Sequence, residues 1–118
     1  MTPRFAAHIL GLCNVCAGAL VFGAPALLLG DLAGVASPAA HLLGTSLAVL
    51  LTATGVGAWL IPPAATRAYL WLFGVAVKTV GGLAWGVAAL ATGAPILMSG
   101  AVVDLAVAAS ITLSLRRR

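Results

Sequence analysis

Two charged side chains, Lys78 and Asp104, stand inside long apolar stretches of the sequence. An ionisable residue within a membrane span is a functional candidate by default, because either charge alone at the bilayer centre costs about 2.5–3.5 kcal/mol. Pairing the two charges offsets much of this cost, so we predict a buried Lys78–Asp104 salt bridge. Such a pair can bind or relay a proton or an anionic group, or it can serve only to fix the register of two helices.

Asn14 and Thr52 are the polar residues that can join this pair. Counted along their own apolar stretches, both lie about nine residues from one end, and Lys78 and Asp104 lie about 11 residues from the same end, which is roughly 16 Å at the rise of an α-helix. Asn14 can donate to Asp104, and Thr hydroxyls hydrogen-bond across membrane helices. We therefore expect a polar layer of these four residues at mid-membrane, as a candidate for binding or for proton relay.

Small residues recur at helical spacing on the faces that carry these polar groups, which allows close helix packing. The face of Lys78 adds candidate pocket-lining residues, namely Trp71, Gly74, Gly81 and Trp85. The faces of the other two polar residues read Ala7-Gly11-Asn14-Gly18 and His41-Thr45-Ala48-Thr52-Gly55-Trp59. We expect these faces to line the interior, with Leu, Val and Ile facing lipid.

Cys13 and Cys16 form a C-x-x-C motif, a spacing that suggests dithiol chemistry in soluble redox proteins. Within an apolar span, two small residues used for packing are the simpler interpretation. The alternative is a thiol pair coupled to a quinone, with Trp71 and Trp85 beside it. A metal site is not expected, because two thiolates have no nearby partners to complete a tetrahedral shell.

His8 and His41 fall near opposite ends of their spans, so one chain cannot use both as axial ligands of a single haem. We expect each to be an interface residue, and we expect Asp31 to be a solvated loop charge. The sequence identifies no cofactor.

The composition fixes the broad class of the protein. Of 118 residues, 63% are hydrophobic and 7% are charged, and the mean hydropathy is +1.19. Soluble domains carry about 25% charged residues. This composition indicates an integral membrane protein in contact with a lipid bilayer, and it excludes a secreted disulfide scaffold, a disordered chain, a nucleic-acid-binding domain and a soluble enzyme.

Four stretches are long enough to cross the hydrocarbon core, which takes about 20 apolar residues. They cover residues 5–29, 40–61, 68–91 and 95–115, and the turn signals between them are Gly30-Asp31 with Ser37-Pro38, Pro62-Pro63 and Gly93-Ala94-Pro95. Short loops force antiparallel neighbours. We predict an all-α fold in which residues 1–118 form a single transmembrane domain, an up-down four-helix bundle.

Basic residues predict the orientation of the bundle, because cytoplasmic segments are enriched in Lys and Arg. Arg4, Arg67 and the terminal Arg116–Arg118 all fall on one side. Both termini are therefore expected in the cytoplasm, in a multi-pass protein of the bacterial inner membrane. The first apolar stretch of about 25 residues is too long for the core of a signal peptide.

Arg67, the pattern Gly74-x-x-x-Lys78-x-x-Gly81 and the Asp104 of the last span together resemble small uncharacterised four-helix bacterial membrane proteins that are loosely similar to DoxX-type bundles. The resemblance covers about half of the chain and implies a membrane bundle, but no established activity. Small multidrug transporters are similar in size and helix count, but they depend on a membrane-embedded Glu in the first helix, where this chain offers Asn14. The strong Lys and Arg bias also argues against the dual topology of that family.

The chain has two acidic residues, so few side chains are present that could act as a general acid or base. We therefore expect a non-enzymatic protein, acting as a small structural or accessory subunit of a homo-oligomer or of a complex with other membrane subunits. One alternative is a small carrier or channel for a proton, an ion or a lipophilic molecule that uses Lys78 and Asp104. The other is a protein that binds a quinone or an isoprenoid.

Overall fold

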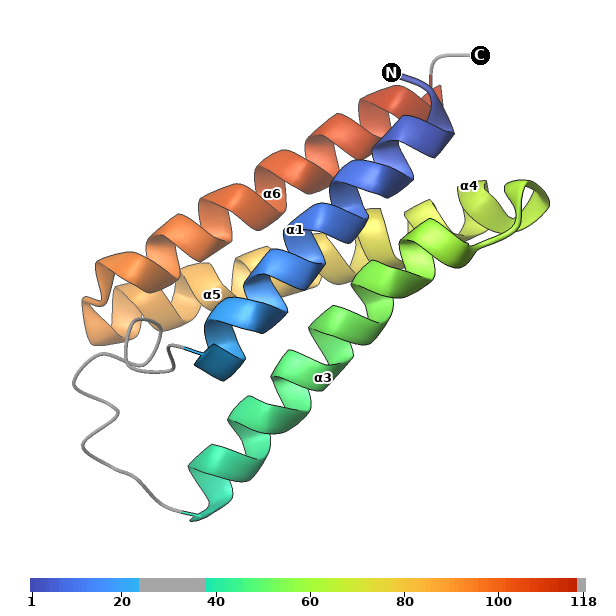
Figure 1. Ribbon diagram of the computed structural model, residues 1–118. Helices are drawn as coiled ribbons and strands as arrows, with labels where there is room; N and C mark the ends of the chain where they lie inside the picture. Colours follow the sequence, from blue (N-terminus) through green and yellow to red (C-terminus); the bar gives the residue numbers. More distant parts are fainter. Residues whose placement is uncertain (24–37, 117–118) are drawn as a thin grey trace.

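The computed structural model describes residues 1–23 and 38–116 (Figure 1). Over these ranges the regular structure is helical and contains no strand. Four helices in the described part are long and apolar enough to cross a membrane. The predicted all-α class and the four candidate spans are confirmed.

Helix α1 is Pro3–Gly23, α3 is Pro38–Leu60 and α6 is Pro95–Arg116. The third candidate span, Pro63–Thr92, has four parts: η2 (Pro63–Ala65), α4 (Thr66–Tyr69), η3 (Leu70–Val77) and α5 (Lys78–Thr92).

The predicted boundaries agree closely with these helices, with one exception. The third span begins at Pro63 instead of Ala68, because proline is accepted in the first turn of a helix, where its missing N–H has no partner to lose. The end predicted for the first span, the Gly30-Asp31 turn with Ser37, and the terminal Arg117 and Arg118 lie outside the described residues.

Segment η3 is a π-helix of eight residues, Leu70–Val77, which ends directly before Lys78. A π-helix closes i→i+5 hydrogen bonds, so its turns are wider than those of an α-helix. Leu70, Gly74 and Lys78 are buried at four-residue spacing, whereas Trp71 is 44% exposed. The interior position expected for Trp71 assumed a regular α-helix, and the π-helix turns this side chain outward.

The helices pack as two pairs, α1 on α3 and α5 on α6, with η3 also against α6 (Figure 1). Glycine lets the backbones of the first pair touch, since a Cβ on Gly55 would lie 2.8 Å from the Gly11 carbonyl oxygen and 2.9 Å from Val15 N. The second pair is joined by Gly93, which ends α5 at φ 71°, and its N–H donates to the Ala89 carbonyl over 2.8 Å. This left-handed position is the usual glycine stop of a helix.

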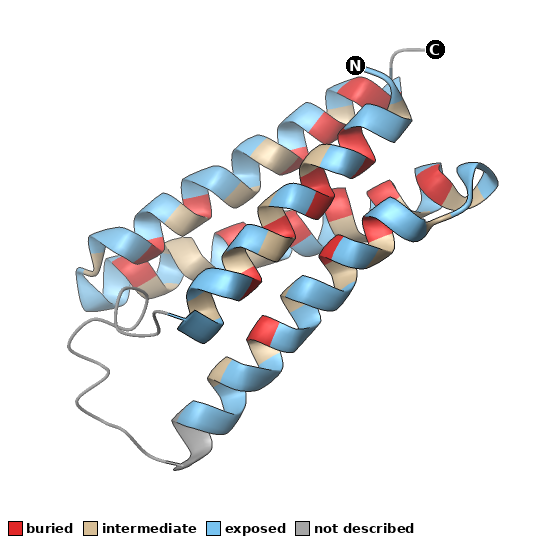
Figure 2. Ribbon diagram, viewed as in Figure 1, coloured by how far each residue is buried: buried red, intermediate tan, exposed pale blue. Residues whose placement is uncertain are grey.

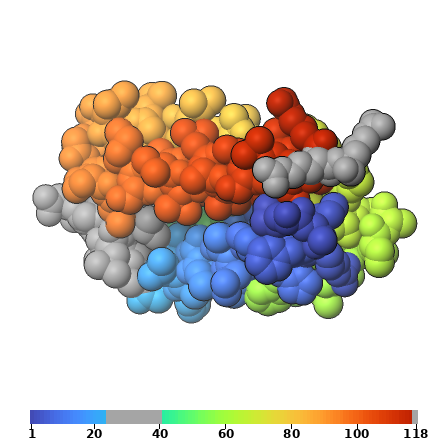
Figure 3. Space-filling view, turned by 90° about the horizontal axis from the view of Figure 1, so that it is seen from above, coloured from blue at the N-terminus to red at the C-terminus, as the bar shows by residue number. Residues whose placement is uncertain are grey.

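The buried core sits at the end of the molecule where α1 begins and α6 ends (Figures 1 and 2). Its members come from α1, α3, η3 and α6, and they are Ala6, Ala7, Leu10, Ala58, Leu70, Ile111 and Leu115. In the view from above, the first turns of α1 lie beside the last turns of α6 (Figure 3). There the Ser114 hydroxyl donates to the Met1 carbonyl over 2.9 Å. The two helix pairs are thus joined chiefly at one end.

Arginines connect neighbouring segments at this same end. Arg4 donates to the Ile61 carbonyl, just after α3, over 2.8 Å, and Arg67 donates to the Leu115 carbonyl of α6 over 2.9 Å. The last carbonyls of a helix have no intrahelical partner, and cations beside them also meet the negative end of the helix dipole. These basic residues therefore stabilise the end of the bundle.

Candidate functional site

The predicted ion pair is present between α5 and α6. Lys78 Nζ lies 2.6 Å from Asp104 Oδ1, and the two side chains are 7% and 18% exposed. Lys78 is the first residue of α5, directly after the π-helix. The more open member is Asp104, so one side of the carboxylate keeps some access to the surroundings while the ammonium group is enclosed.

Two consecutive glycines of α5 make room for this pair. A Cβ on Gly82 would lie 2.8 Å from Leu105 Cγ and 3.2 Å from the Ala101 carbonyl oxygen. A Cβ on Gly81 would lie 3.4 Å from Asp104 Oδ2. The close approach of α5 and α6 therefore depends on Gly82, and Gly81 leaves space beside the second carboxylate oxygen. Gly81, expected to line the interior, is half-buried.

Asn14 bonds to a different partner from the one expected. Its Nδ2 donates to Thr54 Oγ1 over 3.1 Å, and Asp104 bonds to Lys78 instead. Thr54 in turn lies within hydrogen-bond distance of the carbonyls of its own helix at Leu50 and Leu51. Asn14 is 4% exposed, and its Oδ1 has no hydrogen-bond partner within the described ranges.

Thr54, not Thr52, is the hydrogen-bond partner of Asn14. Thr52 is exposed as a whole residue, but its Oγ1 lies against Gly18 of α1. The expected inner face of α3 is otherwise largely confirmed, since Ala48 and Gly55 are buried and the Trp59 ring lies against Gly11 of α1. The expected layer of four is therefore corrected to two separate pairs, Asn14–Thr54 between α1 and α3, and Lys78–Asp104 between α5 and α6. The small residues of α1 did indicate its inner face, since Gly11, Asn14 and Gly18 are all buried.

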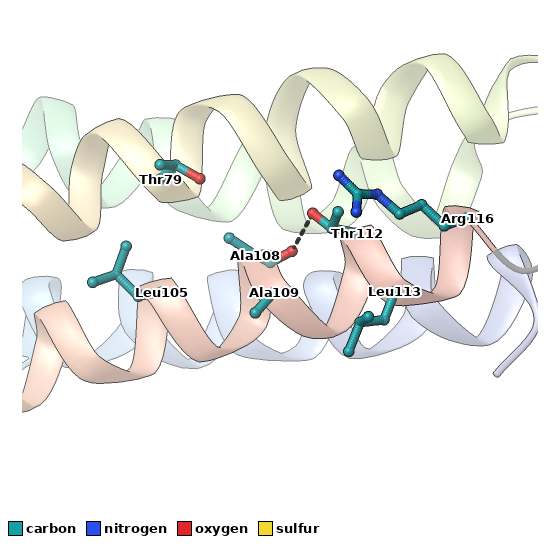
Figure 4. A pocket seen from close by; sticks show the side chains of 7 residues that line it. All are labelled: Thr79, Leu105, Ala108, Ala109, Thr112, Leu113 and Arg116. Carbon is teal, nitrogen blue, oxygen red and sulfur yellow. Dashed lines mark hydrogen bonds between the residues drawn. The ribbon is translucent and has the colours of Figure 1, made fainter.

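The residues expected to line a pocket are dispersed. Trp71 is exposed and Trp85 is half-buried, while Gly74 is packed, with Ile111 Cδ1 2.7 Å from the Cβ position it lacks. A hollow of about 390 Å³ lies elsewhere, along α6 and beside α5. Seven residues line it, namely Thr79, Leu105, Ala108, Ala109, Thr112, Leu113 and Arg116 (Figure 4). We call it the α6 groove.

The cysteines and histidines do not gather into a cluster. Cys13 is half-buried and Cys16 exposed, both as free thiols, and no group of three or more metal-binding side chains occurs in the part of the chain that the structure describes. His8 Nδ1 lies 2.7 Å from the Arg4 carbonyl oxygen of the preceding turn, and His41 is exposed near the start of α3. Binding of a quinone or an isoprenoid stays a prediction.

The chain matches no protein-family model, none of the curated proteins and no solved structure. The resemblance to DoxX-type bundles therefore stays a prediction. The function of the chain has to be inferred from its own residues and their geometry.

Proposed function

We propose that the chain is a non-enzymatic subunit of a homo-oligomer in the bacterial inner membrane. It would cross the bilayer four times, up and down in turn, with both termini in the cytoplasm. Arg4, Arg67 and Arg116 support this orientation, because they lie at the same end of the bundle and cytoplasmic segments are rich in such residues.

The observation that carries the proposal is the one-sided packing of α3. Its buried side chains face α1, and toward its N-terminal end α3 diverges from α6 (Figure 1). Its exposed surface includes the hydroxyl residues Thr45 and Ser46, one helical turn before the exposed Val49 and Leu50. Within a span, exposed hydroxyls are the groups that hydrogen-bond to another helix.

A second copy of the same chain suits this surface. A hydroxyl both donates and accepts a hydrogen bond, so a face carrying Thr45 and Ser46 is complementary to itself. Two-fold interfaces use the same patch on both subunits. The ion pair is consistent with a structural role, because Lys78 and Asp104 neutralise each other and need no substrate to explain them.

The test is the mass of the assembly in mild detergent, measured by light scattering, with cross-linking in native membranes. Replacing both hydroxyls, Thr45→Val with Ser46→Ala, should shift the protein toward the monomer. Thr92→Val is the matched control, since Thr92 is also exposed but donates to its own helix at Ala88 over 2.7 Å. A wild-type protein that is monomeric in both measurements would contradict the proposal.

A small carrier for a proton or an ion is the second candidate, and the buried Asn14 favours it. A buried polar atom without a partner is rare and calls for a reason, and Asn14 Oδ1 is such an atom within the described ranges. Flux into liposomes is the assay. If Lys78→Met and Asp104→Asn together leave the flux of protons and small ions unchanged, this candidate fails.

A further inference from the structure

The α6 groove runs along α6 beside α5, with Thr79 of α5 at its inner end and Arg116 at its outer end (Figure 4). Thr79 and Leu105 directly follow Lys78 and Asp104 in the sequence. The groove therefore begins beside the buried ion pair and ends at the basic end of the bundle.

The length of the groove matches one leaflet of a bilayer. Leu105 and Arg116 are separated by about 11 positions on one continuous helix, which spans roughly 16 Å. The hydrocarbon core of a bilayer is about 30 Å thick, so the groove covers close to half of it. An object lying along it would extend from the membrane centre to the headgroup region.

The wall of the groove is mostly apolar between Thr79 and Arg116. Leu105, Ala108, Ala109 and Leu113 contribute no polar side-chain atoms, and the alanines leave the hollow open. The Thr112 hydroxyl donates to the Ala108 carbonyl over 2.8 Å, so its hydrogen is already engaged within α6. Hydrocarbon is therefore the chemistry that fits the length of the groove.

The outer end of the groove is cationic. In Figure 4 the Arg116 guanidinium turns back toward Thr112 and over the hollow. Arg67 lies nearby, because it bonds to the carbonyl of Leu115, the residue before Arg116. A guanidinium group offers a planar set of donors that matches phosphate.

No carboxylate competes for this end within the described ranges. The two acidic residues of the chain are Asp31 and Asp104. Asp104 is bonded to Lys78 at the inner end of the groove, and Asp31 lies outside the described residues. The charge at the outer end therefore favours an anion.

We propose that the α6 groove binds an anionic glycerophospholipid of the leaflet next to the termini. One acyl chain lies along Leu105, Ala109 and Leu113, and the headgroup phosphate is held by Arg116 with Arg67 close by. The inference requires the chain to lie in a bilayer, but it does not require the oligomer proposed above.

Native mass spectrometry of the full chain tests this inference, with phosphatidylglycerol and phosphatidylcholine of identical acyl chains as probes. We expect retention of one phosphatidylglycerol per chain in preference to phosphatidylcholine. Arg116→Gln should weaken phosphatidylglycerol binding about fivefold, the effect of one basic residue near an anionic lipid surface, and Arg116→Lys should restore part of it. Equal retention of the two lipids by the wild type would mean annular lipid only and would overturn the proposal.

A matched pair of variants tests the groove itself. Ala109→Phe fills the groove and should reduce the binding of both lipids, whereas Ala106→Phe, which is exposed on the same helix but outside the groove, should leave binding unchanged. Equal binding by these two variants, both helical by circular dichroism, would overturn the site. Displacement of the lipid by inorganic phosphate, which has no acyl chain, would also overturn it. The same mass spectra also give the number of chains in the assembly. A monomer that still retains the lipid would therefore contradict the oligomer proposal and leave the lipid site intact.

Discussion

Removing one member of the Lys78–Asp104 pair should destabilise the protein more than removing both. Lys78→Met leaves the Asp104 carboxylate without its cation, and Asp104→Leu leaves the Lys78 ammonium without its anion. The double variant replaces two paired charges with apolar groups of similar volume. Replacing a buried pair in this way is often neutral or stabilising, whereas breaking it strands an uncompensated charge.

The structure sets different costs for the two single variants. Breaking a buried pair costs about 3–5 kcal/mol. The Lys78 side chain is 7% exposed and that of Asp104 is 18% exposed, so a stranded ammonium is the less hydrated of the two. We expect Asp104→Leu to cost close to 5 kcal/mol and Lys78→Met close to 3 kcal/mol on this scale. The double variant should lie within about 1 kcal/mol of the wild type or above it.

The assay is reversible unfolding of the full chain in mixed micelles, followed by circular dichroism, for all four members of the double-mutant cycle. The coupling energy should be several kcal/mol, because the two residues are in direct contact. Two single variants that each cost under about 1 kcal/mol and add in the double variant would refute the reasoning. That result would mean that water reaches the pair and that its desolvation is small.

Two further changes test the packing beside this pair and in the other half of the bundle. Gly82→Ala should destabilise the protein by about 1–3 kcal/mol, because the new methyl group would lie 2.8 Å from Leu105 Cγ. The control is Gly100→Ala, whose new methyl group would meet no neighbouring atom. It should leave the stability unchanged or raise it in the same unfolding assay. Asn14→Leu should lower the free energy of unfolding by less than about 1 kcal/mol. The Thr54 hydroxyl keeps its bond within α3, and the substitution removes an oxygen that has no partner within the described ranges. A loss of about 3 kcal/mol or more would show that Asn14 Oδ1 has an essential partner.

The matching height of Lys78 and Asp104 along their helices was predictable from the sequence, and the hydrogen-bond partner of Asn14 was not. Counting residues from the ends of the apolar stretches placed Lys78 and Asp104 at one height, and that count tolerates an error of a residue or two. The face that a helix turns inward is normally revealed by the contrast between polar and apolar positions. In α3 almost every position is apolar or small, and its small residues did place Ala48 and Gly55 on the inner face. The pattern did not show that Thr54, two positions after Thr52, is the residue that bonds to Asn14.

The π-helix adds a second reason why the interior face of the third span was only partly predicted. The expected face assumed a constant helical period through Trp71, Gly74 and Lys78. A wider turn between Leu70 and Val77 changes the direction of every side chain before Lys78 relative to those after it. The part after the π-helix deviates less, since Trp85 remains half-buried.

For a chain that crosses a bilayer as proposed, the division of the polar groups into Asn14–Thr54 and Lys78–Asp104 bears on how it is inserted. Each bonded pair lies within one helical hairpin. The second hairpin can thus enter the lipid with Lys78 and Asp104 already paired, before it packs against the first hairpin. The first hairpin has no charged residue at the centre of its helices. The two hairpins can then be inserted one after the other. They would pack together last, at the end of the bundle that carries the arginines.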